Sequence, residues 1–298
     1  MHRCLKVIDT FRFSHIKAIT GQRVVSTHSP YFAGQAQIED LRLFIKKGGD
    51  TVSTRLDLSE LQKTDDKRKL QDSVIESRGD ILFSRAVLLF EGQTEEQALP
   101  IWAQKYWGSS IHELGFSFVR ANGTDYFPFI WLAKNLNIPW YVIADGEAKP
   151  VGDLNAALKK AKQPEAAKCS NVVVLPAGSN FERQLLAEGY LPQVELALDE
   201  ASGSTKCLDQ YINRNNGLSY GKTKDGTAKG SRDYEGEEGR LRAAADAMKD
   251  AKTRLARPLA RIISTLTDPA RQFPSNIERL FEIISADHGI KKKGAKSP

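Results

Sequence analysis

The sequence predicts an α/β fold in which a parallel sheet is flanked by helices. Two observations carry this prediction. Short apolar runs alternate with segments of helical length from residue 86 onward, which is typical of βαβ units. The runs are continuously apolar, as in AVLLF at 86–90, and this favours strands that are buried on both faces of a sheet.

The individual elements follow from these patterns. A tight turn after residue 90 leads into a helix, in which Leu99, Trp102 and Ala103 have helical spacing. Turn residues separate the later segments. The further expected strands are 115–123, 138–147 and 171–178, and the further expected helices are 128–137, 153–163, 180–202, 241–264 and 276–289.

The N-terminal part has a different character. Residues 23–30, RVVSTHSP, are predicted as a buried strand that ends in a polar turn. Residues 40–47 and 51–58 are rich in strand-forming residues and surround Gly48 and Gly49, which predicts a hairpin. A polar helical segment follows, and residues 213–240 are rich in glycine and charge, as expected for a long loop.

Composition sets broad limits on function. The chain has 43 Lys and Arg residues against 37 Asp and Glu, a formal net charge of +6, which weakly favours a polyanionic partner but is equally compatible with an ordinary cytosolic protein. The three cysteines are widely spaced and form no CxxC, so we expect a reducing compartment and no zinc site. No apolar run approaches the roughly 18 residues of a membrane span. These features predict a cytoplasmic protein without a membrane partner.

Acidic residues follow two of the predicted strands. Glu91 closes the first strand, and Glu95 lies in the first turn of the next helix. Asp145 closes a second strand and is followed by Gly146 and Glu147. The carboxyl ends of parallel strands share one edge of a sheet, where ligand sites form. Any one of these residues alone is better explained as a solvated loop residue, but together they predict a site.

Clustered carboxylates repel one another unless they are protonated or neutralised. Oxygen ligands of this kind suit Mg²⁺ or Mn²⁺ better than zinc. One or two such ions can activate water and stabilise charge on a phosphoryl group. The expected cofactor is therefore Mg²⁺ or Mn²⁺.

The segments LLFEGQTEEQALP and WYVIADGE resemble the Toprim domain, whose motifs are a strand-terminal Glu before Gly and a later Asp-x-Asp. The resemblance implies that Glu91 binds metal or acts as general acid or base, and that Asp145 binds metal. Glu147 stands where the family usually has Asp. Its longer side chain keeps the charge and shifts the ligand geometry.

A second Glu four residues on, here Glu95, is similar to the OLD (overcoming lysogenization defect) family of nucleases, and the similarity extends over roughly residues 22–265. In LPAGSNFERQLL it implies that Glu182 is a further metal ligand. In AKTRLARPLARII it implies that Lys252 stabilises charge on the cleaved phosphate. A solvated helix lysine is an equally good interpretation of Lys252.

RVVSTHSP resembles the switch-histidine segment of ABC-type ATPases, which OLD proteins carry ahead of the Toprim domain. His28 is the corresponding histidine. A P-loop needs G-x-x-x-x-G-K-[ST] between a strand and a helix, and GLSYGKT at 217–223 is one residue too short. We therefore expect an ATPase remnant that does not hydrolyse ATP by itself.

The resemblance implies the following organisation: an ATPase remnant at 1–58, a connecting helix at 59–82, a Toprim core at 83–190, a helical and flexible insertion at 191–245, and completing helices at 246–298. The predicted function is a metal-dependent DNA endonuclease with a role in phage defence. The alternative is a non-catalytic Toprim module. DNA is the expected partner in the first case, and an ATPase chain or a second copy of this chain in the second.

Overall fold

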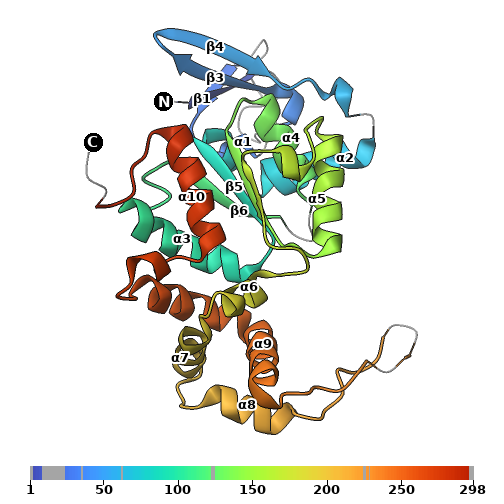
Figure 1. The fold of residues 1–298 in the computed structure, drawn as a ribbon. Coiled ribbons are helices and arrows are strands. Elements are labelled where there is room, and N and C mark those ends of the chain that lie inside the picture. Colours follow the sequence, from blue (N-terminus) through green and yellow to red (C-terminus); the bar gives the residue numbers. More distant parts are fainter. Residues whose placement is uncertain are drawn as a thin grey trace. The chain divides into compact units, whose positions relative to one another are not determined.

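The structure is a computed structural model that describes residues 3–8, 24–34, 36–61, 63–121, 125–223, 226–227 and 229–294 (Figure 1). The residues of the chain divide into two compact units, each with many contacts inside it. The first comprises Met1–Leu89, Ile111–Val142 and Gly152–Val172, and the second comprises Phe90–Ser110, Ile143–Val151 and Val173–Pro298. The division passes through three strands of one sheet, so the ends of those strands belong to the second unit. The domain ranges predicted from the family resemblance follow the domain order of that family and not the contacts within this chain. They stay predictions.

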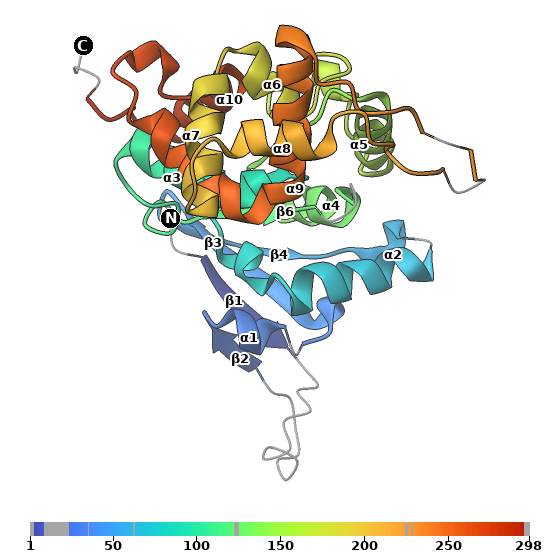
Figure 2. The same cartoon turned by 90° about the horizontal axis from the view of Figure 1, so that it is seen from below.

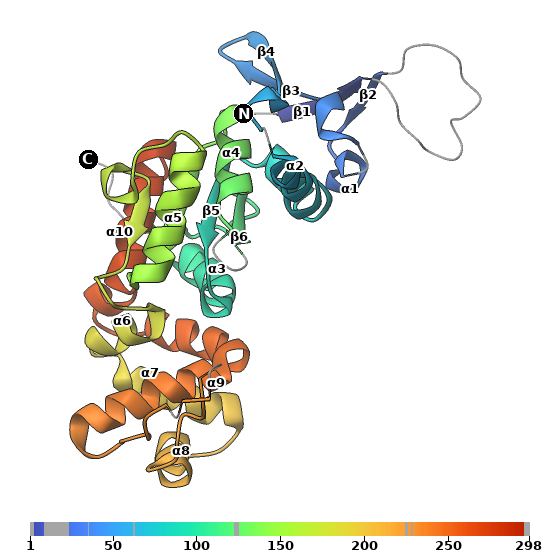
Figure 3. The same ribbon diagram turned by 90° about the vertical axis from the view of Figure 1, so that its right-hand side faces the viewer.

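The first unit contains an antiparallel sheet in the order β2-β1-β3-β4 (Figure 3). Its strands are β1 (Arg3–Ile8), β2 (Val24–Thr27), β3 (Leu41–Lys47) and β4 (Asp50–Arg55). β3 and β4 form the predicted hairpin, in which Lys47 pairs with Asp50 across two glycines. Gly48 and Gly49 have φ values of +55° and +107°, a conformation that favours glycine.

The predicted burial of the strand before His28 is wrong. β2 lies at the edge of the sheet and pairs with β1 alone. Its residues alternate between exposed and half-buried, and Val24 is 50% exposed. An apolar run predicts that a strand forms, but it does not predict the position of that strand in the sheet. A strand at the edge has a neighbouring strand on one side only, so part of it stays exposed.

Two short helices, α1 (Pro30–Ala33) and η1 (Ile38–Asp40), lie between β2 and β3. Four more connect β4 to the next sheet: η2 (Leu58–Glu60), α2 (Thr64–Lys69), η3 (Leu70–Glu76) and η4 (Gly79–Phe83). α2 and η3 run on as one helical segment that buries Leu70, Val74 and Ile75. Lys160 forms an ion pair with the buried Asp66. The segment that the sequence predicted as a polar connecting helix therefore also contributes to a core.

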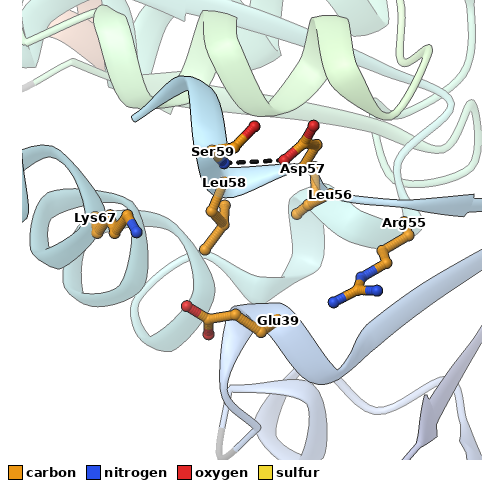
Figure 4. A pocket seen from close by; sticks show the side chains of 7 residues that line it. All are labelled: Glu39, Arg55, Leu56, Asp57, Leu58, Ser59 and Lys67. Carbon is orange, nitrogen blue, oxygen red and sulfur yellow. Dashed lines mark hydrogen bonds between the residues drawn. The ribbon is translucent and has the colours of Figure 1, made fainter. Parts of the chain in front are cut away.

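A pocket of about 570 Å³ lies where η1, β4, η2 and α2 meet. Figure 4 shows Glu39, Arg55 and Lys67, which come from three of these elements, arranged around it. Asp57 accepts a hydrogen bond from the backbone of Ser59 at 2.9 Å and so caps η2. Two cations and two carboxylates line the pocket, so its charges largely compensate one another.

The central sheet has the order β6-β5-β7-β8, and β5 and β7 are parallel. Its strands are β5 (Ala86–Phe90), β6 (Phe116–Arg120), β7 (Trp140–Ala144) and β8 (Val172–Val174). Every residue of β5 and β7 is buried. The helices between successive strands are α3 (Gln93–Trp107), α4 (Phe127–Asn135) and α5 (Ala148–Lys160). The predicted α/β fold with a parallel sheet is confirmed.

The remaining helices belong to the second unit: α6 (Phe181–Ala187), α7 (Leu191–Ser202), α8 (Cys207–Asn215), α9 (Gly236–Ser264), η7 (Pro269–Arg271) and α10 (Ser275–His288). α9 contacts α3, α6, α7 and α8, and Figure 2 shows it next to α7 and α8. Leu255, Leu259 and Ile263 of α9 are at most 1% exposed. α9 is thus the helix around which this unit packs.

Residues 216–234 connect α8 to α9 and were expected to form a loop. The described part is a two-stranded ribbon, with a bridge between Ser219 and Ser231 and backbone hydrogen bonds from Tyr220 to Gly230 and from Arg232 to Leu218. The GLSYGKT segment lies in this ribbon and not between a strand and a helix, as a P-loop requires. Among the described residues, no helix is long and apolar enough to cross a membrane.

Candidate metal centre

Glu91 and Glu95 flank the turn from β5 into α3. Glu91 follows the last residue of the buried strand, and Gly92 is the N-cap of α3. Glu95 lies in the first turn with only 7% of its surface exposed. A Cβ at position 92 would lie 2.1 Å from Oε2 of Glu95. The glycine therefore leaves the space into which the Glu95 carboxylate folds back.

Asp145 and Glu147 follow β7 on either side of a second close approach. The Gly146 N–H donates to the Ser179 carbonyl at 2.8 Å, and the Gly178 N–H donates to the Gly146 carbonyl at 2.8 Å. A Cβ at position 146 would lie 2.1 Å from the carbonyl oxygen of Pro176. Only glycine lets these two backbones meet, and their contact brings the Asp145 loop to the start of α6.

α6 completes the carboxylate group. Asn180 caps this helix by accepting from the Arg183 N–H at 3.0 Å. The backbone N–H of Phe181, the first residue of α6, donates to Oδ1 of Asp145 at 3.1 Å. Glu182 is buried, and Nζ of Lys252 on α9 lies 3.5 Å from its Oε1. α6 thus positions Asp145 directly and connects the cluster to α9.

Five carboxylates lie close enough to influence one another electrostatically. Burial, followed by the negative charges of Asp145 and Glu182, raises the pKa of Glu95 to about 8, while Lys252 acts in the opposite direction. Burial, followed by the charges of Glu91, Glu182 and Glu147, raises the pKa of Asp145 to about 7. Each predicted ligand is therefore close enough to perturb, or be perturbed by, another member of the cluster.

Two predicted residues have partners that the sequence did not indicate. Lys252 pairs with Glu182 and is 36% exposed, so it is not a freely solvated lysine. Glu147 lies 3.8 Å from Arg183 on α6. Arg183 was missed because a surface arginine has no sequence signature, although it directly follows Glu182.

His28 lies in the first unit and is exposed. Its ring centroid is 6.3 Å from that of Phe83. Ser29, which follows it, caps α1 by accepting from the Phe32 N–H at 3.3 Å. The carboxylates and Lys252 all belong to the second unit, and His28 is not one of that group.

The donor set fits a hard divalent cation. Every donor is a carboxylate oxygen, the type that Mg²⁺ and Mn²⁺ prefer. Two of the carboxyl groups resist ionisation near neutral pH because they are buried beside other negative charges, and a bound cation would relieve that repulsion. As the side chains lie, no group of three or more His, Cys, Asp or Glu among the described residues is arranged to hold an ion.

Comparisons with known proteins agree with this arrangement. Residues 82–146 match the family described as overcoming lysogenization defect protein-like, TOPRIM domain. The uncharacterized protein YbjD of Escherichia coli (strain K12) is 25% identical over 126 residues, which cover 42% of this chain and 22% of YbjD. The chain thus spans less than a quarter of the length of that curated relative.

The comparison with solved structures found two further partial matches. The C-terminal region of the Xanthomonas campestris pv. campestris OLD protein is 19% identical, with a TM-score of 0.48, and the match covers 70% of this chain and 96% of that one. The C-terminal region of the Burkholderia pseudomallei OLD protein is 18% identical, with a TM-score of 0.48, and the match covers 69% of this chain and 99% of that one.

A parallel sheet with acidic residues at the ends of β5 and β7 is the arrangement of a Toprim domain. Residues 82–146 belong to the OLD-like Toprim family. Toprim domains generally bind divalent metal ions, and the family is of a nuclease type.

Proposed function

We propose that this chain is a DNA endonuclease that hydrolyses phosphodiester bonds with the help of one or two Mg²⁺ or Mn²⁺ ions. The observation that carries the proposal is the convergence of five carboxylates and one lysine in the second unit, at the end of a parallel sheet. Buried carboxylates that repel one another cost stability. A cluster of this kind is best explained by the cation it would bind.

The carboxylates divide into roles by position. Asp145, Glu95, Glu147 and Glu182 would hold the metal, and Glu91 would bind it or take the proton from the attacking water. A bound divalent ion supplies charge stabilisation and lowers the pKa of water. The Phe181 N–H donates to Oδ1 of Asp145 at 3.1 Å and fixes the orientation of the carboxylate. The other oxygen, Oδ2, would bind the metal.

Lys252 would bind a non-bridging oxygen of the scissile phosphate. Its ion pair with Glu182 holds the ammonium at the cluster. A positive charge that is positioned before the reaction stabilises the charge that develops on the phosphate without a cost of reorganisation. This role favours the functional interpretation of Lys252 over that of a solvated helix lysine.

The test is cleavage of supercoiled and linear DNA by the purified chain with Mg²⁺, with Mn²⁺ and with EDTA. We expect cleavage with either metal and none with EDTA. Glu91→Ala and Asp145→Ala should each lower the rate by at least about a hundredfold. Glu96→Ala is the matched control, because Glu96 is exposed on α3 next to Glu95. Intact DNA under every metal condition would contradict the proposal.

The alternative function is a metal-binding module that acts with an ATPase chain or a second copy of itself. The segment RVVSTHSP, which resembles the switch-histidine segment of ABC-type ATPases, supports this alternative. Metal binding without cleavage, together with cleavage restored by an added ATPase chain, would support it. His28→Ala would then lower the activity of the assembly and leave metal binding unchanged.

A further inference from the structure

A second concave site lies in the same unit as the carboxylates. It is a pocket of about 360 Å³ between α6, α9 and the ribbon at 216–234. Its apolar lining comes from Leu186 and Ala187 on α6 and from Leu241 and Ala245 on α9. Tyr220 of the ribbon, Arg183, Arg242 and Asp246 complete it. Neither the fold nor the proposed metal centre requires such a pocket.

The pocket and the carboxylates are built on the same two helices. Glu182 faces the carboxylates, and the adjacent Arg183 lines the pocket and lies 3.8 Å from Glu147. On α9, Ala245 lines the pocket and Lys252 pairs with Glu182. Seven residues of helix place these two on one face, about 10 Å apart along the axis. In a stacked DNA strand that separation spans roughly three base steps, and fewer nucleotides span it where the strand is unstacked.

Two arginines of the pocket, Arg183 and Arg242, could bind phosphates of a nucleic-acid strand. Arg183 is 63% exposed and so can turn toward a ligand. Arg242 is held by Asp233, to which its Nη2 donates at 3.1 Å, and lies 3.7 Å from Glu238. Arg232 stacks over the Tyr220 ring at 4.9 Å. Arginine side chains of this kind suit the phosphates of a bound strand.

Asp246 gives the pocket a fixed hydrogen-bond acceptor. Its Oδ2 accepts from the hydroxyls of Tyr220 at 2.8 Å and Tyr234 at 2.7 Å. Tyr234 is only 3% exposed, so this carboxylate is anchored from the core side. Asp246 lines the pocket, and its second oxygen, Oδ1, would be the acceptor for a donor bound there. Amino groups on the edges of cytosine and adenine are such donors, and thymine presents a carbonyl at the same place.

We propose that this pocket receives one unstacked base of the DNA strand, within about three nucleotides of the scissile phosphate, and that Asp246 selects a base with an exocyclic amino group. The apolar lining and Tyr220 would contact the base, as side chains do in single-strand binding sites. The position relative to the scissile phosphate rests on the proposed nuclease function. The pocket itself does not.

The test compares binding of fluorescently labelled oligo(dC) and oligo(dT) of equal length to the full chain in Ca²⁺, with the oligonucleotides checked on a gel for cleavage. We expect oligo(dC) to bind about tenfold more tightly than oligo(dT), the value of one good hydrogen-bonded base contact. The two bases match in size, so the difference reports on the base edge. Equal binding of the two by the wild-type chain would overturn the selection by Asp246.

Asp246→Asn tests the proposed acceptor for the base while it keeps the hydrogen bonds to the two tyrosines. The amide oxygen can still accept from both tyrosine hydroxyls, whereas the amide nitrogen would donate to thymine. The preference for oligo(dC) should disappear or invert. Asp250→Asn is the matched control, because Asp250 is on the same helix and accepts from Tyr211 at 2.8 Å without lining the pocket. It should keep the wild-type ratio.

Ala245→Trp fills the pocket and should weaken binding of both oligonucleotides by about tenfold, the worth of one stacked base. Unchanged affinity in this folded variant, or an unchanged ratio in Asp246→Asn, would overturn the proposal. Hydrolysis of bis(p-nitrophenyl) phosphate with Mn²⁺ reports on the carboxylates alone, because this ester has no base to occupy the pocket. It should be the same in both variants as in the wild type.

The two proposals fail in different ways. If the wild-type chain shows the base preference but hydrolyses neither the ester nor DNA, the nuclease function is wrong and the pocket stands. If the ester is hydrolysed and the variants bind as the wild type does, the pocket is wrong and the metal centre stands.

Discussion

Glu95 combines deep burial with proximity to other carboxylates. Only 7% of its surface is exposed, and its pKa is raised to about 8 by burial and by Asp145 and Glu182. Such a group is costly for the folded chain when it is charged. A cation bound by Glu95 would offset this cost.

Glu95→Gln should stabilise the metal-free chain above neutral pH. The folded state retains the Glu95 proton up to about pH 8, whereas the unfolded state loses it near the ordinary pKa of about 4.3. Rising pH between these values therefore favours unfolding of the wild type. The variant has no carboxyl group to ionise at position 95, so its free energy of unfolding does not fall for this reason.

Thermal unfolding in EDTA from pH 5 to pH 9 provides the measurement. The Tm of the wild type should fall relative to that of Glu95→Gln by roughly 2–4 °C per kcal/mol as the pH rises. Glu96→Gln, on the exposed face of the same helix, should follow the wild type. Parallel curves for all three chains would show that Glu95 ionises normally.

Gly92→Ala should impair metal binding more than folding. The φ of Gly92 is −95°, so alanine fits the backbone, but its Cβ would take the place of Oε2 of Glu95. The carboxylate must then move, and affinity for Mn²⁺ by calorimetry should fall by about tenfold. Gly152→Ala in α5 has open space around its Cβ and should leave the affinity unchanged. Equal affinities for both variants would exclude Glu95 as a ligand.

At the scale of elements, α9 combines structural and functional positions. Leu255, Leu259 and Ile263 pack in the core, and Lys252 one turn earlier pairs with Glu182. The helix begins at Gly236, five residues before the expected start at residue 241. The apolar spacing predicted the helix, because its buried face must repeat every three to four residues. It did not predict which lysine faces Glu182.

Lys252→Met should lower the rate of DNA cleavage by about a hundredfold while DNA binding changes by less than about threefold. Methionine keeps the length of the side chain and removes the charge. Lys249→Met is the control, since Lys249 is exposed one turn earlier on the same helix. If both variants lose activity equally, Lys252 acts only through the general charge of α9.

At the scale of the whole molecule, every predicted metal ligand belongs to the second unit. Saturating Mn²⁺ should therefore protect α3, α6 and α9 from amide hydrogen exchange and leave the β3–β4 hairpin unchanged. Binding at a hundredfold excess over Kd stabilises the bound state by about 2.7 kcal/mol. Asp145→Asn should abolish the protection, and protection spread evenly over both units would contradict a metal centre confined to the second.

The sequence by itself determined the parallel sheet and the residues at its edge. Continuous apolar runs fix buried strands, and the direction of parallel strands fixes which ends share an edge. Glu91, Glu95, Asp145 and Glu147 could be named for that reason, and the positions of Gly92 and Gly146 followed from the turns. Glu182 and Lys252 required a family resemblance, because neither terminates a strand.

Tertiary structure alone decided the rest. It placed β2 at the edge of its sheet, paired the glycine-rich segment into a ribbon, and brought Arg183, Tyr220 and Asp246 together at one pocket. These features depend on contacts between residues far apart in the sequence. The local pattern of charge and hydrophobicity does not encode them, because a surface arginine or tyrosine satisfies that pattern in many different surroundings.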